Sequence, residues 1–115
     1  MPYESKIRTY NPDRVTKNTT ISQSLLQNIK LLAEKLDKPY NSLIEEGIDY
    51  VLITYKKQKD LIPPAKPLDR KQLGTTFSEV QYNQLKDRAK KLKTQTNTLI
   101  EIGMNYVLEN RKENK

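Results

Sequence analysis

Polar and apolar residues alternate over residues 14–21, and the alternation returns over residues 70–77. Successive side chains of a β-strand point to opposite faces, so this two-residue period predicts a strand in each segment. In both segments one face carries no apolar side chain, and the core-facing parity of the first carries Val15, Lys17, Thr19 and Ile21. The same parity of the second carries Leu73, Thr75 and Phe77, with Lys71 toward the end. We therefore expect two half-buried strands.

A helical period follows each strand. Apolar residues recur every three or four positions after Ser22 and after Ser78, which indicates an amphipathic helix in each place. Both serines stand where an N-cap belongs, and Gln81 follows Ser78 at the spacing of a capping box. The first apolar stripe comprises Leu25, Leu26, Ile29, Leu32, Ala33 and Leu36. The second is thinner, has Arg88 in place of Leu32, and comprises Val80, Tyr82, Leu85, Ala89 and Leu92.

Short breaks at residues 37–39 and 93–95 precede a second helix in each half. Pro39 suits the first turn of a helix, and Thr94 can cap one. Both second helices keep a glycine, Gly47 and Gly103, which costs about 1 kcal/mol relative to alanine in a helix interior. We expect a close approach of the two helices at these glycines to compensate for that cost.

The two strand-helix-helix units are copies of one another. A shift of 56 residues places residues 13–59 on residues 69–115 without a gap, so that Asp13 falls on Asp69. The identical positions include Arg14/Arg70, Thr20/Thr76, Ser22/Ser78, Ala33/Ala89, Asn41/Asn97, Glu45/Glu101, Gly47/Gly103 and Tyr50/Tyr106. Each copy has under about 50 residues, near the size below which a chain needs a partner to bury its core. We expect the copies to supply that partner to each other, within one compact domain.

Two segments lie outside the repeats. Residues 1–12 show no period and read as a flexible N-terminal arm, either a disordered terminus or an arm that contacts DNA. Residues 60–68 contain Pro63, Pro64 and Pro67, which cannot continue a helix. We interpret them as a semi-rigid linker that spans up to about 30 Å and returns the chain to a second strand beside the first.

Composition narrows the classes of function. The net charge of +7 and the pI near 9.5 suit a polyanionic partner, although many basic proteins bind none. The chain has no histidine, no cysteine and three scattered glycines, and its carboxylates fall mostly on exposed helical positions or near turns, which argues against an enzyme. We expect no cofactor, metal or small-molecule ligand. With no signal-peptide pattern and no apolar run long enough to cross a membrane, we expect a cytoplasmic protein.

Two short motifs carry a resemblance to a known family. They are the run Thr20-Ile21-Ser22-Gln23-Ser24-Leu25-Leu26, followed by Ala33 and Leu36, and the helix opening Asn41-Ser42-Leu43-Ile44. Both resemble the ribbon-helix-helix family of DNA-binding proteins, such as Arc, MetJ and CopG, and the resemblance covers both repeats. It implies a mainly α fold with a short antiparallel two-stranded β-ribbon, in the order β-α-α, linker, β-α-α. One chain would then form an intramolecular pseudo-dimer, as in the tandem transfer protein TraY. Family members often have glycine between the helices, where this chain has Asp37 and Lys93.

The resemblance also implies a way of reading DNA. The ribbon would enter the major groove, which admits two strands and displays a distinct pattern for each base pair. The candidate base-reading residues are Arg14, Thr16, Asn18, Thr20, Arg70, Gln72 and Thr76. The alternative is a plain solvated strand face, and both arginines stand at strand starts, where phosphate contact is equally expected. Gly74 breaks the symmetry with Asn18, so the DNA target should be an imperfect palindrome or none.

The family also holds a phosphate at the N-terminus of its second helix, where free N–H groups favour an anion. Here that position falls on Tyr40, Asn41, Ser42, Thr96, Asn97 and Thr98, with ordinary helix capping as the alternative. A separate basic run reads most simply as a solvated helix face, with a phosphate role as the alternative. It comprises Lys86, Arg88, Lys90, Lys91 and Lys93.

These patterns favour a sequence-specific binder of double-stranded DNA, most simply a transcriptional repressor that binds as a monomer, with further copies cooperating along an operator. One alternative is an accessory DNA-binding protein of a plasmid transfer (relaxosome) complex. A protein-interaction or antitoxin module is the alternative from another class, and we expect little toxin-binding tail after Leu108. A plain four-helix bundle without a ribbon is the structural alternative.

Overall fold

The computed structural model describes residues 14–57, 61 and 66–112. The predicted arm, residues 1–12, therefore lies outside the described residues, as does most of the predicted linker. Within the described parts the chain is mainly helical with one two-stranded antiparallel sheet, as the sequence predicted. The elements are β1 (Arg14–Ser22), α1 (Gln23–Leu36), α2 (Tyr40–Thr54), β2 (Arg70–Ser78), α3 (Glu79–Leu92) and α4 (Thr96–Lys112).

Strands β1 and β2 form an antiparallel ribbon whose central pair is Asn18 opposite Gly74. Its inner face packs on the helices, and it buries Ile21, Leu73, Thr75 and Phe77. The bundle without a ribbon is therefore wrong. Lys71 shares the parity of the buried residues but is exposed, because it lies next to the start of β2.

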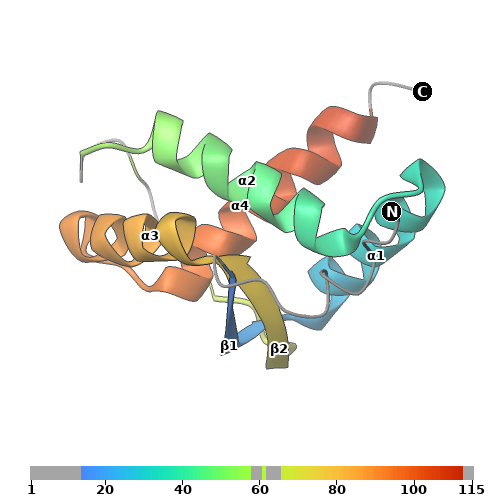
Figure 1. Cartoon of the computed structure of the whole chain (residues 1–115), viewed down its shortest axis with the longest axis horizontal. Coiled ribbons are helices and arrows are strands. Elements are labelled where there is room, and N and C mark those ends of the chain that lie inside the picture. The colour runs from blue at the N-terminus through green and yellow to red at the C-terminus, as the bar shows by residue number, and fades with distance from the viewer. Residues whose placement is uncertain (1–13, 58–60, 62–65, 113–115) are drawn as a thin grey trace, which may run out of the picture.

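Helices α2 and α4 cross at the centre of the molecule, with α1 and α3 at opposite sides and the ribbon below (Figure 1). Gly47 and Gly103 meet at the crossing: a Cβ placed on either would lie 2.5 Å from the carbonyl carbon and oxygen of the other. The predicted close approach is confirmed. One turn further on, the Tyr50 and Tyr106 rings stack with centroids 3.6 Å apart.

Most of the core comes from the same helix pair. The residues with 2% exposure or less include matched positions of α2 and α4, which are Leu43/Leu99, Ile44/Ile100, Ile48/Met104 and Val51/Val107. Ile29 of α1 and Leu85 of α3, which also match across the repeat, are fully buried beside them. These residues belong to one continuous apolar cluster, so both halves of the chain are buried in a common core.

Two expectations for α3 need correction, one for its apolar stripe and one for its basic run. Val80 is 69% exposed, because about 100° per residue places it roughly 200° around the helix from Tyr82. Arg88 does not belong to a solvated basic face: its Nη1 donates to the Leu52 carbonyl at 2.7 Å and to the Tyr55 carbonyl at 2.8 Å. It thereby satisfies carbonyl groups at the C-terminal end of α2, where the helix itself offers no partner.

Helix capping follows the sequence in part. Ser22 and Ser78 are the N-caps of α1 and α3, as predicted, and accept from the backbone N–H groups of Leu25 and Gln81. The predicted capping box is not closed, because the Gln81 side chain instead donates to α2, at the Glu45 carbonyl and at Asp49 Oδ1.

Asp37 and Lys93 lie in the turns between the helices, where members of the ribbon-helix-helix family often have glycine. Their φ angles are 59° and 57°, in the left-handed region. The next residue in each turn closes the helix end, since Lys38 N donates to the Ala33 carbonyl and Thr94 N to the Ala89 carbonyl, both at 2.9 Å. Both turns thus adopt the left-handed conformation without glycine, although glycine is the residue that adopts it at the lowest cost.

We predict that Gly47→Ala destabilises the fold strongly. The added methyl would meet the backbone of α4, so the crossing helices must separate, at a cost of about 3 kcal/mol or more. Gly74→Ala is the matched control, since its Cβ would meet only the flexible Asn18 side chain at 2.8 Å. Urea unfolding followed by circular dichroism measures both, and equal stabilities for the two variants would contradict this account of the crossing.

Candidate nucleic-acid interface

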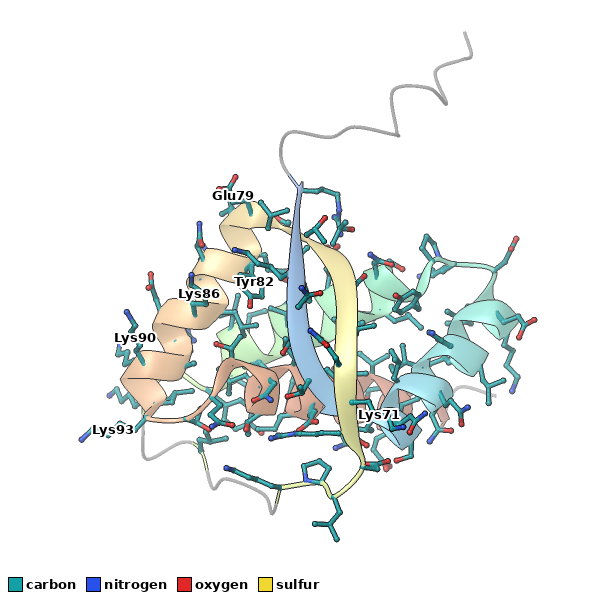
Figure 2. All side chains as sticks on the ribbon, turned by 90° about the horizontal axis from the view of Figure 1, so that it is seen from below. Lys71, Glu79, Tyr82, Lys86, Lys90 and Lys93 are labelled. Carbon is teal, nitrogen blue, oxygen red and sulfur yellow. The ribbon has the colours of Figure 1, made fainter. Side chains whose placement is uncertain are left out.

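The outer face of the ribbon brings together uncharged polar side chains from both strands. Thr16, Asn18 and Thr20 of β1 and Gln72 of β2 are exposed, and Thr76 is half-buried. Thr16 stands opposite Thr76, and Thr20 stands opposite Gln72. Figure 2 shows this face from below, with the two strands in front of the helices. Five of the predicted base-reading residues therefore lie on one surface.

Gly74 gives the centre of this surface its asymmetry. A Cβ at Gly74 would lie 2.8 Å from the Asn18 Oδ1 atom, so the Asn18 amide leans across the strand into the space that glycine leaves. Asn18 is therefore the only side chain at the central pair of the ribbon. An amide can pair with the edge of adenine through two hydrogen bonds.

The two predicted arginines lie at the ends of the ribbon, where each pairs with a glutamate, and Arg14 also contacts Thr76 of the outer face. Arg70 binds Glu101 through two hydrogen bonds, from Nη2 to Oε1 at 2.6 Å and from Nε to Oε2 at 2.9 Å. Arg14 Nη2 lies 2.5 Å from Glu45 Oε2 in the matching pair. The hydrogen bonds to Glu101 raise the pKa of Arg70 above its ordinary value, which is the effect expected of a carboxylate that stabilises the charged form.

Each of these glutamates also joins the two halves of the chain. Glu101 Oε2 accepts from the Ser22 backbone N–H at 2.8 Å, and Glu45 Oε2 accepts from the Ser78 backbone N–H at 3.3 Å. Glu101 is buried, which makes it an exception to the mostly exposed carboxylates that the sequence suggested. A buried carboxylate is stable where an arginine and further donors satisfy its oxygens. The recurrence of Glu45 as Glu101 was the available signal for this role.

Two residues predicted to contact phosphate also bind the ribbon. Asn97 Nδ2 donates to the Thr20 hydroxyl at 2.9 Å and to the Thr20 carbonyl at 3.0 Å. Asn41 Nδ2 makes the matching contacts to Thr76, at 3.1 Å to the hydroxyl and 3.2 Å to the carbonyl. Each helix N-terminus is thereby fastened to the strand of the other half.

These amides also set what the threonine hydroxyls can offer. A hydroxyl has two acceptor lone pairs and one hydrogen. Thr20 Oγ1 accepts from Asn97, and Thr76 Oγ1 accepts from both Asn41 and Arg14 Nε, the latter at 3.3 Å. In these contacts the hydrogen of each hydroxyl is not used, so it can be donated to a further acceptor. Both threonines suit acceptor atoms such as N7 and O6 of guanine, N7 of adenine or O4 of thymine.

The remaining predicted phosphate residues are divided between surface and interior. Ser42 is exposed, with its hydroxyl donating to the Pro39 carbonyl at 2.8 Å, and Thr96 is half-buried. Thr98 is buried within 3.4 Å of Arg70 Nη2, and the half-buried Tyr40 hydroxyl donates to Thr75 Oγ1 at 3.5 Å. Pro39, the N-cap of α2, supplies no side-chain cap, so N–H groups of the first turn of α2 have no side-chain acceptor there.

No protein-family model, curated protein or solved structure matched the chain in three separate comparisons. Among the described residues no group of three metal-ligating side chains comes together. Within the same part of the chain no helix is long and apolar enough to cross a membrane. The geometry of the ribbon and its supports therefore carries the functional interpretation.

We predict that Asn97→Ala loosens the end of the ribbon. Losing a side chain that donates to both the hydroxyl and the carbonyl of Thr20 should cost about 1 kcal/mol and speed amide exchange at residues 19–21. Asn105→Ala, at an exposed position of the same helix, is the matched control. Amide exchange followed by nuclear magnetic resonance measures the effect, and equal protection in the two variants would refute the proposed fastening.

Proposed function

We propose that this protein recognises a specific sequence in double-stranded DNA by placing the ribbon of β1 and β2 in the major groove, and that it acts as a transcriptional repressor. The supporting observation is an exposed antiparallel ribbon whose outer face offers uncharged hydrogen-bonding groups. The major groove is wide enough for a two-stranded ribbon and presents donors, acceptors and methyl groups to it. Occupying the groove would exclude other proteins from the same DNA.

The two halves act in this proposal as the two subunits of a ribbon-helix-helix dimer joined in one chain. The contacts between the two halves support this arrangement. Some of them join residues that match across the repeat, and others occur once in each half. Gly47 meets Gly103, Tyr50 stacks on Tyr106, and the Asn97–Thr20 contact is repeated as Asn41–Thr76. Such an arrangement gives each strand a partner that a single repeat lacks.

The distribution of charge supports groove binding. Base edges can be read by neutral amide and hydroxyl groups as well as by arginine, and phosphates are held largely by cations and backbone N–H groups. The exposed outer face of the ribbon is uncharged between its ends, and the chain as a whole carries a net charge of +7. Hydrogen-bonding groups that can face base edges, on a basic protein, are features expected of a sequence-specific DNA-binding protein.

In vitro selection from duplexes with a randomised core tests the proposal. Binding should be selected at about 150 mM salt, because low salt strengthens non-specific binding. We expect one enriched sequence that is asymmetric at its centre, where Asn18 faces Gly74. Enrichment of no sequence would overturn the proposal. Binding of the enriched sequence upstream of the protein's own gene would support repression, whereas its occurrence at a transfer origin would favour the accessory role.

We predict that Asn18→Ala weakens binding to the selected duplex about 10- to 100-fold, because a two-bond contact with a base is worth about 1–3 kcal/mol. Affinity for random duplexes should stay unchanged, since the amide contributes no charge. The control is again Asn105→Ala, which removes the same amide from α4. Gel-shift titration measures both variants. Equal affinities of the two variants for the selected duplex would exclude reading by the centre of the ribbon.

A further inference from the structure

One face of α3 carries a row of lysines beside the ribbon. Lys86 and Lys90 are four residues apart, which places them on the same side of the helix, Lys93 follows as the C-cap, and all three are exposed. Figure 2 shows them along α3 in the view that faces the ribbon, with Tyr82 and Glu79 on the same side nearer the start of the helix.

The row continues onto the ribbon through Tyr82. Lys86 Nζ lies 5.9 Å from the centroid of the Tyr82 ring, and Lys17 Nζ of β1 lies 5.5 Å from the same centroid. The ring is 8% exposed and packs on Phe77 with centroids 5.0 Å apart, so it is a fixed support for both cations. An aromatic face attracts a cation at this distance, which holds the two ammonium groups close to the ribbon edge.

The other side of the ribbon lacks this row. The shift of 56 residues matches Lys17, Lys90 and Lys93 with Leu73, Glu34 and Asp37. Lys86 matches Lys30, whose Nζ lies 5.2 Å from the ring centroid of Tyr40 on α2. The lysine row of the α3 side is thus matched on the α1 side by one lysine and two acids, although Lys71 of β2 is an exposed lysine at that side of the ribbon (Figure 2).

Stabilisation of the helix end does not explain the row. Lysines in the last turn interact favourably with the helix dipole, but this effect has no preference for one face. Lys91 lies in the same last turn as Lys90, about 100° further around the helix, and interacts with the helix dipole equally well. Helix α1 has the same length with Lys35 as the single basic residue of its last turn. The helix dipole therefore does not account for the position of these lysines on the side toward the ribbon.

We infer that Lys17, Lys86, Lys90 and Lys93 bind phosphates of the DNA backbone beside the ribbon, and that they do so on the α3 side alone. This inference rests on the proposed function. It adds that the protein contacts a longer stretch of DNA on one side of the ribbon than on the other. The charge of a duplex lies on its phosphates, and a row of lysines on a helix beside the groove complements that charge. The protein then has one orientation on its target, despite its two similar halves.

The salt dependence of binding to the selected duplex tests the row. The test variant is Lys90→Gln/Lys93→Asn, with asparagine at position 93 because the backbone there is left-handed, with φ of 57°. The control is Lys35→Gln/Lys91→Gln, which removes the same charge from exposed last-turn positions. The slope of log affinity against log salt should flatten by about 2 in the test variant, at about 0.9 for each phosphate that is no longer neutralised, and hardly change in the control.

Trimming the flanks of the duplex gives the second readout. Shortening the DNA on the α3 side should weaken binding of the natural protein more than that of the test variant, which keeps Lys17 and Lys86, and shortening the other side should affect neither. Equal slopes for test and control, or equal effects of trimming either side, would overturn the inference while leaving ribbon recognition intact. Failure to select any duplex would instead refute the proposed function, and this inference with it.

Discussion

The pairing of β1 with β2 is the contact on which the rest of the structure depends. Two strands alone are only marginally stable in water, and each strand here finds its partner in the other half of the chain. The pairing brings Ser22 and Ser78 to Glu101 and Glu45, so it also positions the starts of α1 and α3. The crossing of α2 over α4 at Gly47 and Gly103 then supports the ribbon from behind.

The two copies share their internal contacts and differ on their surfaces. The arginine–glutamate pairs, the asparagine–threonine contacts and the glycine crossing recur in both halves. Divergence falls on the outer face of the ribbon, where Gly74 matches Asn18, and on the side of α3, where Lys90 matches Glu34. A shared interior with diverged surfaces fits a protein that presents two unlike halves to an asymmetric target.

Local patterns in the sequence predicted the strands and helices well, but they did not predict which distant residues contact each other. The alternation over residues 14–21 and 70–77 predicted both strands, and the glycines of α2 and α4 predicted the crossing. Strand parity also predicted the exposure of Thr16, Asn18 and Gln72. It did not predict that glutamates from α2 and α4 hold the arginines, because that pairing depends on how the helices pack. Val80 was misassigned because apolar character was counted without its angle around the helix.

The central claim is that the ribbon reads the major groove, and chemical substitution of the DNA tests it most directly. Replacing guanine and adenine in the selected duplex by their 7-deaza analogues removes the N7 acceptor of the major groove and leaves the minor groove unchanged. The account predicts a marked loss of affinity at the few positions under the ribbon. Unchanged affinity at every position, together with a loss when the minor-groove amino group of guanine is removed by inosine, would contradict it.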